Sequence, residues 1–375
     1  MKLNIYKKKI FISCTEQSGE NICYNILKNI DYKNYIIDGI SGKNSQKFFR
    51  KKYFDISLFK SIGFVEIIFS IFKFVKIIDF VSNEIRINQY DIIICIDSPD
   101  FNYNLVKKIR KSGFNKKIIQ IVAPTVWAWR PNRAKKFAKL YDEIFTLFEF
   151  EKKYFENYGL KTTFIGHPIY HIKKNYNDNK IKKNYISFLM GSRENEIKKL
   201  FKYFEVIYNY INSNKNLDFI IFIPTLPHLE SLIKNKTKNW NVKTIISTNN
   251  DLNDKYYQRV FMSITCSGTA SLEISKRLIP QIIIYKLNIL TEFIFSFLVK
   301  VKYANLLNII KNEMIIQELV NHKLTRTKLL NTFKYFLFNK TVRSKQLSKI
   351  QKTIQLIDTG IDPYKIITNR LKKII

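Results

Sequence analysis

Short apolar runs of strand character alternate with helical stretches along the whole chain, and this alternation most constrains the fold. The runs are rich in Ile, Val and Phe, whereas a strand with one solvated face would alternate apolar and polar residues. Apolar strands separated by helices are typical of a parallel sheet covered by helices on both faces. The expected strands are Ile10–Cys14, Asp91–Ile96, Ile118–Val122 and Glu143–Leu147 in a first half, and Ile186–Met190, Phe219–Ile223, Lys243–Ile246, Val260–Thr265 and Gln281–Tyr285 in a second.

The length of the chain predicts more than one domain. It has 375 residues, and a single hydrophobic core stops growing at about 250–300 residues. The first set of strands ends before Gly166-His167-Pro168, and the polar stretch 173–183 is typical of a linker. We therefore predict an α/β protein of two doubly wound, Rossmann-like domains facing a cleft, at 1–170 and 171–341, followed by a helical tail at 342–375.

The net charge is +34, from 64 Lys and Arg residues against 30 Asp and Glu residues. Such a charge favours an anionic partner: a phosphorylated substrate, an anionic bilayer or nucleic acid. However, the lysines are scattered, and the abundance of Lys, Asn, Ile, Tyr and Phe is typical of an AT-rich genome. No base-stacking or groove-reading motif supports nucleic-acid binding, so the charge alone does not define the partner.

The spacing of histidine and cysteine does not favour a metal site. His167 and His171 are four residues apart, but Pro168 between them disrupts the helix that a metal-binding pair would need. The cysteines lie far apart and sit mostly in apolar runs, so we expect buried free thiols in a reducing cytosol. They are Cys14, Cys23, Cys95 and Cys266.

A loop with two tryptophans is the most distinctive motif. Residues 124–130 read Pro-Thr-Val-Trp-Ala-Trp-Arg and follow the expected strand Ile118–Val122. Open α/β sheets bind their ligands at the carboxyl ends of the strands, so Trp127, Trp129 and Arg130 are candidates for shaping a binding site. The alternative is a pair of core tryptophans that only bury area.

Two further turns of the first half carry candidate chemistry. Residues 15–20, Thr-Glu-Gln-Ser-Gly-Glu, lead from the first strand into a helix, which favours a phosphate or sugar site; an N-cap with an acidic first turn is the alternative. Residues 96–101 read Ile-Asp-Ser-Pro-Asp-Phe after another strand. We favour Asp97 as a general base and Asp100 as the cap of a helix that begins near Asn102, with the reverse assignment still open.

The second half has two comparable turns. Arg193 ends the turn 190–193, and its guanidinium suits a diphosphate because it makes bidentate contacts; the alternative is pairing with the glutamates that follow. Residues 266–273 read Cys-Ser-Gly-Thr-Ala-Ser-Leu-Glu, where small residues let a ligand approach and helix-start amides attract phosphate. Thr269 and Glu273 share a helix face. Glu273 therefore lies one turn from the expected phosphate site, where its carboxylate can accept hydrogen bonds from ribose hydroxyls. An ordinary capped helix is the alternative.

Residues 62–81 are apolar and about as long as a membrane span, but four charged residues interrupt them. Each would cost about 2.5–3.5 kcal/mol at the centre of a bilayer. The polar residues form a stripe on one side of a helix, which either packs on the domain core or lies in a membrane interface. We favour membrane contact here, with the apolar run 287–301 as a second candidate. The expected contact residues are Phe64, Phe69, Phe72, Lys73 and Lys76.

In order and spacing, these motifs resemble those of the lipid-A-disaccharide synthases over roughly residues 10–322. The family's Ala-Gly-Glu-x-Ser-Gly-Asp is similar to residues 14–20, its Ile-Asp-x-Pro-Asp-Phe to 96–101, and its Pro-Ser-Val-Trp-Ala-Trp-Arg to 124–130. Its Phe-Pro-Phe-Glu resembles residues 148–151, and its Phe-x-Gly-His-Pro resembles residues 164–168. Its nucleotide-side motifs resemble residues 191–193 and 267–273. Near the end, the family pattern is also followed by residues 298–300, Tyr303 and Asn308. The chain departs from the family pattern at four places. Thr15 stands where the family has Gly, Glu20 where it has Asp, Leu307 where it has Pro, and Lys311-Asn312 where it has Ala-Gly.

The resemblance implies the glycosyltransferase B fold, with UDP in the second domain, the acceptor in the first, and the helices of 342–375 crossing back to the first domain. It implies transfer of 2,3-diacylglucosamine from UDP to the 6-hydroxyl of 2,3-diacylglucosamine 1-phosphate, with inversion, giving a β-1,6 disaccharide 1-phosphate and UDP. Asp97 would be the general base, with Glu16 as an alternative. Arg193 and the amides of 267–269 would stabilise the departing diphosphate, so we expect no cofactor and no metal.

The resemblance also implies roles for the remaining candidates. Both substrates carry acyl chains, so we expect a cytoplasmic enzyme that binds peripherally to the inner membrane surface, without nucleic acid or an obligatory protein partner. The rival interpretations are another UDP-sugar enzyme of this fold, such as a lipid-linked N-acetylglucosaminyltransferase or an epimerase, and a basic nucleic-acid-binding protein. Expected donor-binding residues are Arg193, Ser267, Gly268, Thr269, Glu273 and Asn308; expected acceptor-side residues are Ser18, Gly19, Asp100, Trp127, Trp129 and Arg130.

Overall fold

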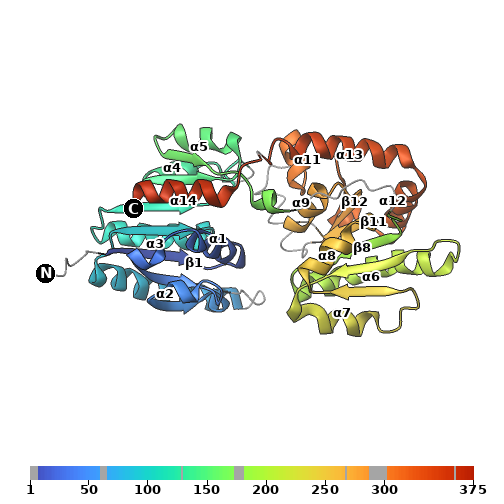
Figure 1. Ribbon diagram of the computed structural model, residues 1–375, viewed down its shortest axis with the longest axis horizontal. Helices are drawn as coiled ribbons and strands as arrows, with labels where there is room; N and C mark the ends of the chain where they lie inside the picture. The colour runs from blue at the N-terminus through green and yellow to red at the C-terminus, as the bar shows by residue number, and fades with distance from the viewer. Residues whose placement is uncertain are drawn as a thin grey trace. The chain divides into compact units, whose positions relative to one another are not determined.

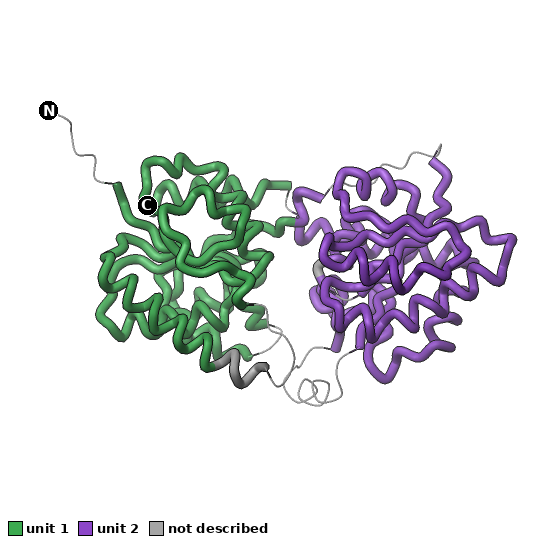
Figure 2. The backbone as a smooth tube through the Cα atoms, turned by 90° about the horizontal axis from the view of Figure 1, so that it is seen from below, with its two compact units in different colours: residues 1–168, 360–375 green, residues 169–359 purple. Residues whose placement is uncertain are grey.

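The computed structural model of the protein describes residues 7–59, 66–127, 130–172, 181–266, 268–286, 302–358 and 360–375, and only the backbone of 66–71 and 269. The chain divides into two compact units (Figure 2). The first unit contains residues 1–168 and 360–375, and the second contains residues 169–359. Each unit is built around its own parallel sheet, as the apolar runs predict.

The first unit has a seven-stranded sheet in the order β3-β2-β1-β4-β5-β6-β7. Every neighbouring pair is parallel, and helices cover both faces (Figure 1). One face packs on α1 and α14, and the other on α2, α3, α4 and α5. The strands are β1 (Lys8–Cys14), β2 (Tyr35–Ser41), β3 (Lys51–Asp55), β4 (Ile92–Ile96), β5 (Lys117–Ile121), β6 (Glu143–Thr146) and β7 (Lys161–Phe164); the helices are α1 (Gln17–Lys28), α2 (Glu66–Asn88), α3 (Pro99–Lys111), α4 (Arg133–Ala138), α5 (Lys152–Glu156) and α14 (Pro363–Ile374).

The second unit has a six-stranded sheet in the order β10-β9-β8-β11-β12-β13, again parallel throughout. Residues of α6 and α12 pack on one face of this sheet, and residues of α8 and α9 on the other. Its strands are β8 (Tyr185–Leu189), β9 (Ile220–Pro224), β10 (Thr244–Ser247), β11 (Val260–Cys266), β12 (Gln281–Tyr285) and β13 (Gln317–Val320); its helices are α6 (Glu194–Ser213), α7 (Glu230–Thr237), α8 (Asn250–Tyr257), α9 (Thr269–Lys276), α11 (Leu306–Lys311), α12 (Arg326–Phe338) and α13 (Lys340–Ile354). Short 3-10 helices in the two units span Tyr32–Asn34, Gln46–Phe48, Ile56–Phe59, Glu149–Glu151, Pro168–His171, Pro227–Leu229 and Asn321–Lys323.

All nine strands expected from the sequence are present, and four more were missed: β2, β3, β7 and β13. Three of these four are the outer strands of the two sheets. Edge strands are partly solvated, so they carry lysines, threonines and glutamine instead of an unbroken apolar run. The fourth, β2, contains Asp38 and Gly39, which the apolar pattern does not predict inside a sheet.

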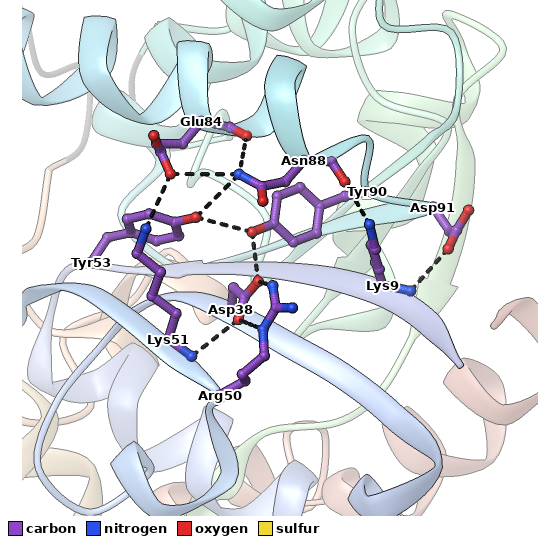
Figure 3. A network of polar contacts seen from close by, with 9 residues as sticks. All are labelled: Lys9, Asp38, Arg50, Lys51, Tyr53, Glu84, Asn88, Tyr90 and Asp91. Carbon is purple, nitrogen blue, oxygen red and sulfur yellow. Dashed lines mark hydrogen bonds and ion pairs between the residues drawn. The ribbon is translucent and has the colours of Figure 1, made fainter. Parts of the chain in front are cut away.

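Asp38 is compatible with a buried strand because a polar network satisfies its carboxylate (Figure 3). The side chain is fully buried and accepts hydrogen bonds from Tyr90 Oη (2.7 Å), Arg50 Nε (3.0 Å) and the backbone N–H of Lys51 (3.0 Å). Burial raises the pKa of Tyr90, so its hydroxyl stays protonated and donates. A buried polar group is tolerated when it is fully hydrogen-bonded, and this network joins β2 to the start of β3 and to the residues before β4.

The helical tail is divided between the units, whereas the resemblance implies that all of 342–375 crosses to the first domain. Helix α13 packs on α9 and α11 of the second unit. Only α14 belongs to the first unit, where it packs on α1 (Figure 1). Arg370 of α14 makes two bonds of 2.8 Å to the buried carboxylate of Glu143 on β6. Bonds from Arg370 and Thr163 overcome the opposing effect of burial and lower the pKa of Glu143.

Candidate active site

The carboxylate of Asp97 lies against the first turn of α1. Strands β1 and β4 are neighbours, with Cys14 opposite Ile96, so the turns that follow them lie side by side. The hydroxyl of Ser18 donates a hydrogen bond to Asp97 Oδ2. A Cβ atom on Gly19 would lie 3.0 Å from the carbonyl oxygen of Ile96 and 3.3 Å from Asp97 Cβ. Glycine at this position therefore permits the close approach of the two turns, and the structure brings Asp97, Ser18 and Gly19 together.

The backbone around Asp97 is held in an unusual conformation. Asp97 and Ser98 have φ values of 55° and 45°, in the left-handed region that costs a non-glycine residue of order 1–3 kcal/mol. The carbonyl of Asp97 accepts bonds from Asn102 Nδ2 (2.8 Å) and Gln120 Nε2 (3.0 Å), and its N–H donates to Ile121 (2.9 Å). These contacts fix the direction of the half-buried carboxylate. Both amide residues were missed, because neither belongs to a recognisable motif.

Glu16 and Asp100 lie close by in the sequence but in different surroundings from Asp97. Glu16 is exposed and occupies the N-cap position of α1, although its side chain makes no capping bond. Asp100 is 68% exposed and pairs with Arg133 (2.9 Å), with Arg130 at 3.9 Å. The expected capping role of Asp100 is wrong: α3 begins at Pro99, and its N-cap residue is Ser98. Asp100 instead ties the first turn of α3 to Arg130 at the end of the tryptophan loop and to Arg133 at the start of α4.

The tryptophan loop is anchored through Trp127. The indole Nε1 donates a 2.8 Å hydrogen bond to Glu151 Oε1, and the ring packs edge-to-face on Phe148 and Phe150. Trp127 is half-buried, and these contacts fix the direction of its ring. It therefore buries apolar area and also holds a defined position on the loop. Arg130 is exposed with a left-handed φ of 54°, whereas Trp129 lies outside the described residues.

Glu151 was missed as a functional candidate, although it belongs to the motif at 148–151. It is 2% exposed, and its Oε2 accepts bonds from the N–H groups of Leu147 (3.0 Å) and Phe148 (3.1 Å). Burial raises the pKa of Glu151 to about 7. His167, which stacks on Phe148, has a pKa lowered to about 4 by burial. A buried carboxylate thus joins the loops that follow β5 and β6, and a neutral imidazole packs beside them.

In the second unit, the turns after β8 and β11 are neighbours because these strands pair directly. Arg193 is 80% exposed and lies 3.8 Å from Glu196, so the expected alternative of pairing with a following glutamate does occur. Glu196 also accepts a 3.1 Å bond from the N–H of Ser192. The guanidinium nevertheless remains on the surface at the start of α6, where a diphosphate could replace one weak ion pair.

The small-residue turn after β11 leads into α9. Gly268 is the N-cap residue, with φ of 133°, and no atom of the described residues lies within 4 Å of a Cβ built there. Ser267 and the side chain of Thr269 lie outside what the structure describes. Glu273 is 34% exposed, and it accepts a 3.2 Å bond from Arg277, which also reaches Asp254 at 2.6 Å.

Asn308 lies inside the second unit, and every hydrogen-bonding position of its amide has a partner. Its Nδ2 donates to the carbonyl of Ile316 (2.8 Å) and to Glu318 Oε1 (2.6 Å), while its Oδ1 accepts from the N–H groups of Ile315 and Ile316 at 2.8 Å. The residue is fully buried. The structure therefore places Asn308 as a support for the chain around it, and Glu318 is a partner that sequence reasoning missed.

The expected membrane helix both packs on the core and exposes apolar side chains. Ile77, Val81 and neighbouring residues of α2 are buried, whereas Phe72 is 66% exposed, with Lys73 and Lys76 exposed beside it. Phe64 and the run 287–301 lie outside the described residues, as does the side chain of Phe69. Among the helices that the structure describes, we find no candidate for a membrane-spanning segment.

All four cysteines are buried and free, as expected. Within the described residues, no cluster of three His, Cys, Asp or Glu side chains could hold a metal ion. The candidate residues therefore form two groups. One follows the strands of the first sheet around Asp97 and Trp127, and the other follows β8 and β11 of the second sheet around Arg193 and Gly268.

Comparisons of this sequence with family models and with known proteins identify the same family. A family model described as Lipid-A-disaccharide synthetase matches residues 10–365. A lipid-A-disaccharide synthase of Rickettsia typhi is 35% identical over 368 residues, covering 95% of this chain and 96% of the relative. One of Rickettsia prowazekii is 35% identical over 360 residues, covering 93% and 94%.

Solved structures share the fold at low sequence identity. The calicheamicin glycosyltransferase CalG4 has a TM-score of 0.63 at 8% identity, with 98% of both chains covered. MurG of Acinetobacter baumannii has a TM-score of 0.60 at 12% identity, with 98% of this chain and 99% of that chain covered. These likenesses confirm the predicted fold class, two doubly wound domains of the glycosyltransferase B type.

Proposed function

Because the chain belongs to the lipid-A-disaccharide synthetase family, we propose that it transfers 2,3-diacylglucosamine from UDP to the 6-hydroxyl of 2,3-diacylglucosamine 1-phosphate. The oxygen of that hydroxyl attacks the anomeric carbon and its proton passes to a base. The bond from the anomeric carbon to the UDP oxygen breaks, so UDP leaves and a β-1,6 disaccharide 1-phosphate forms with inversion.

The arrangement of Asp97 is the observation that carries this proposal. A general base must reach the acceptor hydroxyl at about 2.6–3.2 Å in the reacting complex. Asp97 follows a strand of the first sheet, keeps its carboxylate partly accessible, and has that carboxylate oriented by Ser18 and by a strained backbone. Strain of this kind is typical of residues held in place for function. Glu16, exposed at the neighbouring N-cap, is the alternative base.

The second unit would hold the nucleotide. A departing diphosphate is stabilised by positive charge that is already in place, and Arg193 supplies an exposed guanidinium at the start of α6. The N-terminus of α9 adds amide groups that attract phosphate, and apart from its chain neighbours no described atom lies within 4 Å of a Cβ built on Gly268. Glu273, partly exposed one turn further along α9, would accept bonds from ribose hydroxyls. These groups would stabilise the leaving group without a cofactor or metal.

Acylated substrates require access to a membrane surface, so we place the enzyme peripherally on the cytoplasmic face of the inner membrane. The exposed large apolar residues among the described side chains of α2 support this placement: Phe72, Val75, Phe80 and Ile87. Lys73 and Lys76 lie among them, and each basic residue near an anionic leaflet contributes about 1 kcal/mol. An exposed apolar stripe with lysines beside it is typical of an interfacial helix.

The decisive experiment compares Asp97→Asn with Asp218→Asn, using UDP-2,3-diacylglucosamine and 2,3-diacylglucosamine 1-phosphate as substrates. Asparagine at 97 still accepts the bond from Ser18 but cannot take a proton, so kcat should fall by about 10²–10⁴-fold. The same change at Asp218 should leave kcat within about twofold, because this 77% exposed side chain pairs with the exposed Lys182 on the surface of the second unit. Glu16→Gln tests the alternative base in the same assay.

Product analysis separates the rival activities. Mass spectrometry should find the disaccharide 1-phosphate and UDP in equal amounts with the wild-type protein. An epimerised sugar nucleotide formed from UDP-N-acetylglucosamine, with no disaccharide from the acylated pair, would refute the proposal. Full transfer activity in Asp97→Asn would refute the role of Asp97 alone.

A further inference from the structure

A buried glutamate on β13 organises the chain segment that precedes α11. Glu318 is 6% exposed. Its Oε2 accepts a 2.8 Å bond from the N–H of Ala304, and its Oε1 accepts bonds from the N–H of Asn305 (2.8 Å) and from Asn308 Nδ2 (2.6 Å). Hydrogen bonds to a charged acceptor are stronger than neutral ones, so this carboxylate fixes the segment 304–308 firmly to the sheet.

Asn305 extends this order to α9. Its Oδ1 accepts a 2.9 Å bond from the N–H of Leu307 and so caps α11, while its Nδ2 donates a 2.8 Å bond to Ser271 Oγ. The Ser271 hydroxyl in turn donates a 2.7 Å bond to the carbonyl oxygen of Gly268. Asn305 and Ser271 are 2% and 1% exposed, so water does not compete for these bonds. A continuous chain of hydrogen bonds therefore runs from Glu318 to the N-cap of α9.

The last bond of this chain controls an N–H group of the predicted phosphate-binding turn. The carbonyl of Gly268 and the N–H of Thr269 belong to one planar trans peptide and point in opposite directions. Holding the carbonyl inward therefore aims that N–H outward, toward the side from which an anion would approach. The backbone N–H of Ser271 donates a second bond of 3.1 Å to the same carbonyl, so the hydroxyl of Ser271 adds to a restraint that the first turn of α9 already provides. Gly268 has a φ of 133°, and apart from its chain neighbours no described atom lies within 4 Å of a Cβ built there, so side-chain packing at Gly268 itself adds no further restraint.

We propose that Glu318 and Asn305 are positioning residues for the donor nucleotide, acting through Ser271 to fix the peptide between Gly268 and Thr269. This inference rests on the proposed function, because it takes the ligand of that turn to be the diphosphate of UDP. Neither residue touches the nucleotide. Their contribution is the preorganisation of one N–H donor, which lowers the cost of binding.

Ser271→Ala and Ser275→Ala form a matched pair of variants that tests this inference. Both serines are buried on α9, and each loses one hydroxyl on substitution. The Ser275 hydroxyl donates to the carbonyl of Ser271 and accepts from Gln281 Nε2, both at 2.8 Å, so it does not bond to Gly268. The two variants should therefore lose similar stability, but only Ser271→Ala removes a bond to the Gly268 carbonyl, which then keeps the backbone bond from residue 271 alone.

Binding of UDP to the full-length protein, measured by isothermal titration calorimetry, is the main readout. Losing one hydrogen bond of about 0.5–1.5 kcal/mol should raise the Kd of UDP about two- to tenfold in Ser271→Ala, and leave it within about 1.5-fold in Ser275→Ala. Asn305→Ala, which breaks the preceding link, should raise the Kd at least as much as Ser271→Ala. In steady-state assays, KM for the donor should rise while KM for the acceptor and kcat at saturating donor stay unchanged.

The outcomes separate this inference from the proposed function. If the wild-type protein binds no UDP, the inference and the proposed function both fail. If the wild type binds UDP, and Ser271→Ala and Asn305→Ala bind it equally well, only the positioning role fails. Equal weakening by Ser271→Ala and Ser275→Ala, with equal loss of thermal stability, would show a purely structural effect and would also overturn the inference.

Discussion

Replacing Glu151 with glutamine should change how the stability of the first unit depends on pH. Burial raises the pKa of Glu151 in the folded protein to about 7, from an ordinary value of 4.5. Between these pH values the folded state binds more protons than the unfolded chain. The stabilising contribution of the protonated carboxyl is therefore fully present below pH 4.5 and is lost as the pH rises through about 7.

The magnitude follows from the size of the shift. At 1.36 kcal/mol per pKa unit, the two values correspond to a loss of about 3 kcal/mol in total, most of which falls between pH 5 and pH 8. Glutamine does not titrate, so the variant lacks this loss. The free energy of unfolding of Glu151→Gln should therefore rise relative to the wild type by about 2–3 kcal/mol across this range. His167 and the other titrating groups are common to both proteins and cancel.

Urea unfolding followed by tryptophan fluorescence measures this difference in the first unit alone. In a Trp240→Phe background the remaining tryptophans, Trp127 and Trp129, both belong to the first unit. Glu149→Gln is the matched control, because Glu149 is exposed and two residues from Glu151, and its pH profile should parallel that of the wild type. A Glu151→Gln profile that also stays parallel to the wild type, within about 0.5 kcal/mol from pH 5 to pH 8, would refute the reasoning.

Three further changes test other parts of the structure. Gly19→Ala should lower kcat about tenfold with little loss of stability, because the new Cβ would lie 3.0 Å from a backbone oxygen and displace the turn that orients Asp97; rates beside thermal melts would check this. Arg370→Leu should lower the free energy of unfolding of the first unit by about 3 kcal/mol at pH 7, measured in urea, since it leaves the buried Glu143 without its main partner. Phe72→Glu should release the protein from anionic vesicles in flotation assays, whereas the same change at the exposed Tyr158, elsewhere in the first unit, should not.

Isoleucine-rich strands could be predicted from the sequence because they are buried on both faces. In β4, Ile93, Ile94 and Ile96 are almost completely inaccessible to solvent, so their apolar character reflects their position directly. The strand β2 could not be predicted in this way. Its Asp38 is buried only because Arg50 and Tyr90, 12 and 52 residues away, converge on the carboxylate. A local pattern contains no information about partners at such separations.

The same distinction applies to the candidate site. Asp97 and Gly268 are predicted as site residues because each lies in the turn after an apolar strand, where open α/β sheets bind their ligands. Asn308 was also singled out, but its amide groups are taken up by Glu318 and the backbone around Ile316. A motif identifies a residue under local constraint, but it does not distinguish contact with a ligand from support of a loop.

Buried carboxylates have a particular importance in a chain with only 30 acidic residues against 64 basic ones. Glu20, Glu151 and Glu318 are each at most 6% exposed, and each accepts hydrogen bonds from two backbone N–H groups. A lysine cannot replace them, since it has no acceptor. Replacement of acidic residues by lysine therefore costs little stability at exposed positions. At these three positions, however, it would leave the backbone N–H groups of a loop beside the predicted site without their acceptor. Neutral substitutions at these glutamates should therefore impair activity more than charge reversal of any exposed acidic residue outside that site.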